Sequence, residues 1–305
     1  MGKVEVTKDT LGFREETKHT LKFFNKAIIQ MEENLFSDSV NSVNKATWFD
    51  FRKVKNIRGG AILRLISVLC ALDKKRGYMR YIPPTETAAR ITFRKYKLFT
   101  EMGSPLSEPL MPLPIEFRDV MVISGDKTND QSRKIRPFLI KLGIDENVAT
   151  PINDYIWEMI NNVEKHAYEE GDYPTFLGER WYLRIAKEGE RIVFTLLDNG
   201  VGIPATVSKK KFWEEKIWRR GEEHDSFYIF TALKKDNRSS VEGHLGGGLT
   251  SVYRGYKRGH LQNLEIFSRR GRCRLKPWGW GYDLSRARNL PASFRGTMFC
   301  WDYAC

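Results

Sequence analysis

The five residues Asp198-Asn199-Gly200-Val201-Gly202 constrain this chain more than any other segment. They follow residues 191–198, RIVFTLLD, whose β-branched and aromatic content predicts a strand. An acidic side chain therefore ends a strand, and two glycines follow it. Glycine lets the backbone turn tightly and approach another group closely. The segment predicts a ligand-binding turn at the end of a buried strand.

A helix is predicted over residues 151–171, before this strand. Glu158, Asn162 and His166 are spaced four apart in it, so they share one face, while Met159 and Val163 belong to an apolar face. A Glu-x-x-x-Asn spacing alone is common and usually marks a solvated stripe. Its significance depends on the segments that follow.

Two further segments complete a pattern. Residues 243–249, GHLGGGL, precede a predicted helix whose first amides can face a phosphate group. Gly296-Thr297 begins a predicted strand near the end of the chain. In chain order the pattern is a helix with an asparagine, an acid-glycine turn, a glycine-rich loop before a helix, and Gly-Thr on a strand.

This order of motifs resembles the GHKL superfamily of ATPases, which includes sensor histidine kinases, type II topoisomerases and anti-sigma serine kinases. The resemblance covers residues 145–303, and the wording NNVEKHAY is most similar to the anti-sigma kinase branch. It implies an α/β fold of the Bergerat type: a sandwich of a mixed sheet covered by helices, with a left-handed βαβ layout. It also implies an ATP site that uses Mg²⁺.

The resemblance assigns the binding roles. Asn162 would ligate Mg²⁺ and Lys165 would reach a phosphate oxygen, whereas His166 is either a neighbour of the nucleotide or a polar helix-end residue. Asp198 would accept a hydrogen bond from the adenine amino group, with Thr297 supporting it from the adjacent strand. Glycines would keep the site clear of side chains around the purine and the phosphates, with Leu249 ending the second loop: Gly200, Gly202, Gly243, Gly246, Gly247 and Gly248.

Glu158 stands where GHKL ATPases and serine kinases place the carboxylate that polarises the attacking water or hydroxyl. Residues 205–242 would form the lid over ATP, and residues 227–240 would report the bound nucleotide to a partner.

The N-terminal half shows an alternation of strands and helices. Strands are predicted at 46–51 and 78–84, and helices at 61–77 and 86–103, which implies parallel strands with helical crossovers. A further helix, or two short ones, is predicted over 10–36. Residues 38–104 resemble a STAS domain. Regulatory STAS domains carry a phosphorylated Ser or Thr where this chain has Asn56–Ala61, without a hydroxyl, so the resemblance implies a scaffold or docking surface.

Four prolines in residues 103–118 predict an irregular connection. At 305 residues the chain is long enough for two domains. We expect a helical segment at 1–37, a STAS-like α/β domain at 38–140 and a GHKL ATP-binding domain at 141–305.

The net charge of +13 is concentrated in the last third, where residues 206–305 hold 20 Lys and Arg against 10 Asp and Glu. Basic clusters such as Arg269, Arg270, Arg272 and Arg274 accompany Trp278, Trp280 and Tyr282, a mixture suited to nucleic acid. The alternative is a solvated surface. No apolar run suits a membrane span or secretory signal, and the four cysteines form no CxxC pair, so we expect a cytoplasmic protein with reduced thiols.

The expected function is an ATP-driven conformational switch with Mg²⁺-dependent ATPase activity, acting on a protein partner or within a homodimer. Two alternatives stay open. One is a serine/threonine kinase of the anti-sigma type acting on a STAS-like partner, and the other is an ATP-regulated nucleic-acid-binding module.

Overall fold

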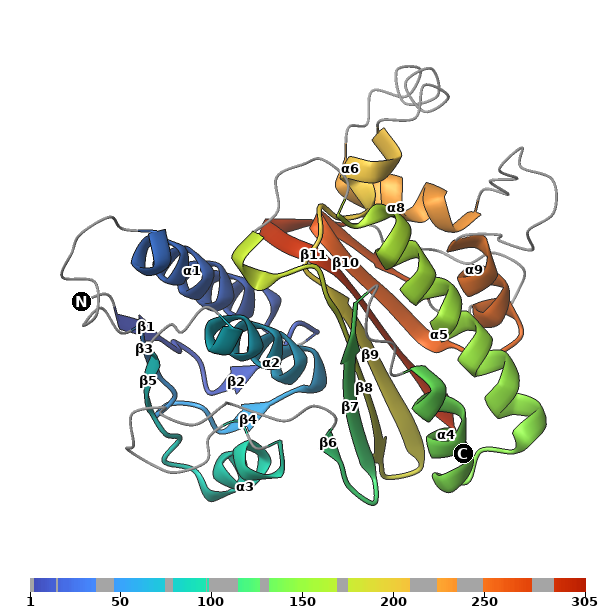
Figure 1. The fold of residues 1–305 in the computed structure, drawn as a ribbon, viewed down its shortest axis with the longest axis horizontal. Helices are drawn as coiled ribbons and strands as arrows, with labels where there is room; N and C mark the ends of the chain where they lie inside the picture. The colour runs from blue at the N-terminus through green and yellow to red at the C-terminus, as the bar shows by residue number, and fades with distance from the viewer. Residues whose placement is uncertain are drawn as a thin grey trace. The chain divides into compact units, whose positions relative to one another are not determined.

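The computed structural model describes residues 3–14, 16–36, 47–74, 79–96, 98, 115–126, 132–168, 175–208, 224–234, 249–275 and 288–305. The chain forms two compact units, drawn in Figure 1. The first comprises Met1–Ile115 with Thr175–Gly178, and the second comprises Glu116–Pro174 with Glu179–Cys305. The division after Ile115 lies earlier than the predicted boundary at 140/141, because residues 120–125 pair with the sheet of the second unit.

The first unit is built on parallel strands, as the alternating pattern predicted. β1 (Lys3–Glu5), β3 (Thr47–Asp50) and β5 (Met79–Ile82) form a parallel sheet in the order β1-β3-β5. A second parallel pair joins β2 (Thr10–Leu11) to β4 (Asn56–Ile57). The prediction of a helix from residue 10 was therefore wrong at its start, because Thr10 and Leu11 pair with another strand.

In the described part of the unit, three helices accompany these strands: α1 (Thr17–Phe36), α2 (Gly59–Lys74) and α3 (Thr87–Lys95). Aromatic rings from separate segments meet in the core. The ring centroids of Phe23 of α1 and Phe49 of β3 are 6.1 Å apart, and those of Phe51 and Phe93 of α3 are 5.1 Å apart. These contacts bury large apolar surfaces in edge-on geometry, which stabilises the packing of α1 and α3 on the strands.

The second unit contains a six-stranded sheet in the order β10-β11-β9-β8-β7-β6. Strand β6 (Ile115–Glu116) spans the division between the units. The others are β7 (Val120–Gly125), β8 (Trp181–Glu188), β9 (Arg191–Asp198), β10 (Gln262–Arg274) and β11 (Arg288–Ala304).

β9 and β10 both pair with β11 and therefore run in the same direction, and the left-handed βαβ layout of this half stays a prediction. The neighbouring strands from β7 to β10 are antiparallel, so these pairs differ from the mixed sheet that was expected. The reason lies in the connection between β7 and β8. The long helix α5 (Glu146–His166) ends beside the turn after β9, the edge at which β7 ends and β8 begins. Because the connection leaves and re-enters at one edge, β8 must run opposite to β7.

Helix α5 starts at a side-chain cap, since the Asp145 carboxylate accepts a hydrogen bond from the Asn147 amide at 2.8 Å. Its apolar residues face the core formed with the sheet, where Phe194 stacks on Trp301 at 4.9 Å. Among the described residues, the other helices of the unit are α4 (Ile135–Lys141), α6 (Ile203–Ser208), α8 (Asp225–Lys234) and α9 (Leu249–Lys257). Among the described residues, no helix combines the length and the apolar character that crossing a membrane requires.

Candidate functional site

Asp198, the last residue of β9, is the centre of a fixed polar arrangement. Its side chain is buried, with 3% of the residue exposed, and it lies between Trp181 of β8 and Thr297 of β11 in the strand register. Its Oδ1 atom accepts two backbone hydrogen bonds, from the Gly200 amide at 2.8 Å and from the Thr297 amide at 3.2 Å. Two amides on one carboxylate oxygen fix the orientation of the whole group.

The two glycines of the turn are required by close packing. A Cβ on Gly200 would lie 2.1 Å from the Ala167 carbonyl oxygen, and the neighbouring Val201 amide donates to that same oxygen at 2.8 Å. Gly202 has a φ of +87°, and its Cβ would lie 2.7 Å from Ser268 Oγ. The predicted role was to clear space for a purine. The structure shows both glycines packed against protein, so that the turn joins the end of α5 to β10, and the role beside a purine stays a prediction.

Thr297 belongs to a hydrogen-bonded network across the strand ends. Its hydroxyl lies 3.1 Å from Ser268 Oγ, which also accepts a hydrogen bond from the Ile203 amide at 2.9 Å. Gly296 has a φ of +96°, and its carbonyl accepts a hydrogen bond from Ser268 Oγ at 3.3 Å. This network ties β10, β11 and the start of α6 to the Asp198 turn.

We expect Gly296→Ala to destabilise the protein by about 2–5 kcal/mol, because a positive φ costs about 1–2 kcal/mol and overpacking about 1–3 kcal/mol. The new Cβ would lie 2.0 Å from the Asp198 carbonyl oxygen. Gly189→Ala is the matched control, since Gly189 has a φ of +63° and nothing within 4 Å of its Cβ position. Denaturant unfolding measures both variants. Equal losses in the two variants would show that close approach to Asp198 is unimportant.

Glu158 and Asn162 lie half-buried on one stripe of α5. The Asn162 Nδ2 group donates a hydrogen bond to the Glu158 carbonyl at 2.8 Å, which holds the amide against its own helix. Asn162 Oδ1 and the Glu158 carboxylate have no hydrogen-bond or ion-pair partner within the described part of the chain. The stripe therefore presents an oriented amide oxygen and a carboxylate, both of them oxygen ligands or acceptors.

Lys165 and His166 lie at the C-terminal end of α5, where Lys165 is exposed and His166 is half-buried. The His166 carbonyl accepts a hydrogen bond from Thr206 Oγ1 at 3.5 Å. A helix C-terminus carries partial negative charge, so basic side chains are favourable there. They would also reduce the repulsion of any anion near this end of the helix.

Helix α9 runs beside α5 (Figure 1). Gly255 lies against the Tyr155 ring, where a Cβ would come within 2.7 Å, while Leu249 packs near Val207 of α6. Helix α6 begins next to the end of α5, so the first residue of α9 lies toward that end of α5. Helices α5 and α9 are therefore antiparallel. Gly255 is the seventh residue of α9, so the first residue of α9 lies about 9 Å from it along the helix axis. The predicted glycines Gly243, Gly246, Gly247 and Gly248 lie outside the described residues.

Tyr168 is a part of the site that sequence reasoning missed. Its hydroxyl donates to the Arg180 carbonyl at 2.6 Å and accepts from the Asn199 amide at 3.3 Å. Burial, with a smaller contribution from the Asp198 carboxylate, raises the pKa of Tyr168 well above 10. The neutral hydroxyl thus pins the turn to the end of α5. Its position two residues after His166 gave no signal, because it depends on the fold of β8 and β9.

Part of the predicted lid at 205–242 is packed on the sheet. Helix α8 lies within it, yet Ile229 is fully buried and a Cβ on Gly271 of β10 would lie 2.6 Å from its side chain. Asp225 Oδ2 also accepts a hydrogen bond from the Arg270 amide at 2.8 Å. Residues 225–233 are therefore fastened to the sheet and are not a free cover. Residues 209–223 and 235–248 lie outside the described part of the chain.

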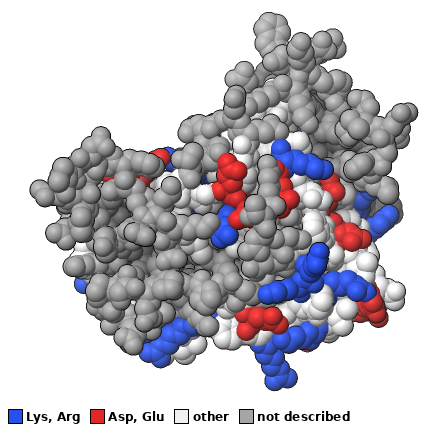
Figure 2. All heavy atoms as spheres, viewed as in Figure 1, with Lys and Arg blue, Asp and Glu red and all other residues white. Residues whose placement is uncertain are grey.

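The basic stretch of β10 reaches the turn after β9. A Cβ on Gly202 would lie 3.0 Å from Arg269 Cγ, so Arg269 borders the turn. Arg272 pairs with the buried Glu265 at 2.6 Å, so its charge is used internally. Figure 2 shows acidic and basic side chains intermingled among the described residues of the face in view. Trp278, Trp280 and Tyr282 lie outside the described residues.

Within the described residues, no group of three or more His, Cys, Asp or Glu side chains could hold a metal ion. All four cysteines are free thiols. Comparison with protein-family models gives no match, and comparison with curated proteins gives none either.

Proposed function

We propose that the second unit binds ATP beside Asp198 and hydrolyses it with Mg²⁺, and that the protein acts as a nucleotide-driven conformational switch. The observation that supports this most is that the Asp198 turn packs against the end of α5, the helix that carries Glu158 and Asn162, and that α9 packs beside the same helix. These segments are separate in the sequence. A site for ATP needs a group for the base at one end and groups for the phosphates at the other, and these segments supply both.

The adenine end would be Asp198. Its carboxylate is oriented by the Gly200 and Thr297 amides, and a buried, oriented acceptor discriminates strongly for a ligand that carries a matching N–H group. The GHKL resemblance assigns the adenine amino group to this position. Tyr168 would act as a positioning residue by holding the turn against α5.

The phosphate end would lie between α5 and the start of α9, where first-turn amides favour anions. Asn162 fits a Mg²⁺ ligand, because its amide nitrogen is tied to the helix and its oxygen is left as the acceptor. When bound, Mg²⁺ would supply neutralisation of the phosphate charge. Glu158, one turn earlier, would orient and deprotonate the attacking water.

The remaining proposals rest on resemblance. The helices α5 and α9 beside an antiparallel sheet are proposed to be a Bergerat-type sandwich, and the parallel first unit a STAS-like docking domain. We place the protein in the cytoplasm, with a protein partner or a second copy as the receiver of the switch. The internal pairing of Arg272 gives no support to the nucleic-acid alternative.

Incubation of the full chain with γ-labelled ATP tests the reaction. We expect released inorganic phosphate that requires Mg²⁺, with no label retained on protein, because Asn56–Ala61 offers no acceptor hydroxyl. A cell extract is added in a parallel reaction. Label on an added protein would favour the kinase alternative. If no phosphate is released and no protein is labelled, the chain would be a sensor that only binds ATP and not an ATPase.

A further inference from the structure

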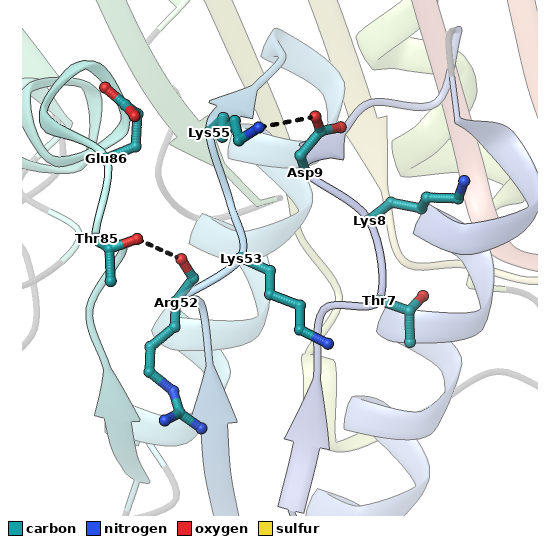
Figure 3. Close-up of a pocket in the computed structure, with 8 residues that line it drawn as sticks. All are labelled: Thr7, Lys8, Asp9, Arg52, Lys53, Lys55, Thr85 and Glu86. Atoms are coloured by element: carbon teal, nitrogen blue, oxygen red, sulfur yellow. Dashed lines mark hydrogen bonds and ion pairs between the residues drawn. The ribbon is translucent and has the colours of Figure 1, made fainter.

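A pocket lies in the first unit, outside the proposed nucleotide site. Its volume is about 390 Å³, within the range of small-molecule sites. Figure 3 shows that its residues come from the three loops that follow β1, β3 and β5. The carboxyl ends of parallel strands are where open α/β sheets bind ligands. The lining residues are Thr7, Lys8, Asp9, Arg52, Lys53, Lys55, Thr85 and Glu86.

The pocket is formed where two paired strands are interrupted together. Before the gap, the Val6 amide donates to the Asp50 carbonyl at 3.2 Å. After it, the Lys55 amide donates to the Asp9 carbonyl at 2.7 Å, and the parallel pairing of β2 with β4 follows. Loops 7–9 and 52–54 are thus held at both ends, and the space between them is a fixed feature of the sheet.

The third wall is fastened in the same way. Thr85 Oγ1 donates to the Arg52 carbonyl at 2.9 Å, which joins the loop after β5 to the loop after β3 (Figure 3). Helix α3 begins immediately afterwards, and its N-cap residue Glu86 makes no side-chain capping hydrogen bond. The first amides of α3 therefore have no acceptor from that side chain, and they add positive potential to this wall.

The charges of the pocket favour an anion. Four of the eight lining residues are Lys or Arg and two are Asp or Glu. Arg52 is neutralised by the buried Asp50 at 2.7 Å, and Lys55 pairs with Asp9 at 3.7 Å. Lys8 and Lys53 are exposed and have no ion-pair partner among the described residues. Two lysines on facing loops are left for a ligand, Lys53 extending toward the 7–9 loop and Lys8 extending outward from it (Figure 3).

We propose that this pocket binds a small phosphate ester of sugar-phosphate or nucleoside-monophosphate size, with its phosphate held by Lys8 and Lys53. The volume admits an organic group beyond the phosphate itself. Hydroxyls at Thr7 and Thr85 and the carboxylate of Glu86 supply partners for ribose or sugar hydroxyls. The site makes the first unit a sensor of a metabolite that is independent of ATP bound to the second unit.

Calorimetric titration of the full chain with ribose 5-phosphate tests the proposal, with ribose and inorganic phosphate as separate probes. We expect the ester to bind, and the double variant K8E/K53E to weaken it at least about tenfold, since about 1.4 kcal/mol of lost attraction suffices for that factor. K22E/K26E, the same charge change on exposed positions of α1, should bind like wild type. Asp198→Asn should also bind like wild type, which separates this site from the nucleotide site.

The proposal is overturned if ribose 5-phosphate does not bind, if K8E/K53E binds it as wild type does, or if Asp198→Asn abolishes binding. Binding of ribose or of inorganic phosphate as tightly as the ester would overturn the ester as the ligand class. Denaturant unfolding verifies that each variant folds. Should K8E/K53E fail to fold, K8A/K53A takes its place with the same expected loss.

Discussion

Asp198→Asn is expected to lower the affinity for Mg²⁺-ATP by about 5- to 150-fold, because an unpaired buried donor costs about 1–3 kcal/mol. Asparagine can keep Oδ1 as the acceptor for the Gly200 and Thr297 amides. Its other terminal atom becomes an NH₂ group, a donor facing the adenine amino group. The turn should therefore remain folded while recognition of the base is lost. Calorimetry with Mg²⁺-ATP measures the effect.

Asp302→Asn is the matched control for this variant. Asp302 is also buried in the sheet, but it pairs with Val193, five residues before Asp198 in β9, and binds Arg191 at 2.7 Å. Its substitution should lower the free energy of unfolding and leave ATP affinity unchanged. If Asp198→Asn binds ATP as tightly as wild type does, the assignment of the base site is wrong.

Glu158→Ala is expected to bind Mg²⁺-ATP while turnover falls by about 10²- to 10⁴-fold, the usual contribution of general-base catalysis. A base contacts the attacking water and not the nucleotide, so the variant becomes trapped with ATP bound. Asn162→Ala should instead lose both tight Mg²⁺-ATP binding and turnover, because the oriented amide oxygen is removed. Steady-state phosphate release and calorimetry distinguish the two variants.

Asp154→Ala controls for removing a carboxylate from α5, since Asp154 is exposed one turn before Glu158. It should behave like wild type in both measurements. In the switch hypothesis, the trapped Glu158→Ala form also shows ATP-dependent protection from protease in residues 205–242, and Asn162→Ala does not. If Glu158→Ala and Asn162→Ala both bind and hydrolyse ATP as wild type does, the stripe is only a solvated helix face and the proposed mechanism is wrong.

Local pattern was enough to predict most elements of this protein. The apolar spacing of residues 152–163 determines which face of α5 is buried, and the β-branched run at 191–198 determines β9. The parallel pairing of β3 with β5 followed from their alternation with helices. Glycine at 200 and 202 could be recognised as a backbone requirement. These features depend on residues close in sequence, whose preferences are visible one segment at a time.

Pairing between distant segments was decided only by the tertiary structure. β7 and β8 are antiparallel because the intervening connection returns to one edge, a fact about its path that no periodicity encodes. Gly200 contacts Ala167, Arg269 borders Gly202, and Tyr168 reaches Asn199, each across at least 31 residues of chain. The pocket of the first unit likewise exists only because two distant strands are interrupted at matching positions. Local amino-acid pattern specifies which chemical groups stand at the ends of which elements, while the register and direction of packing determine which of those groups meet.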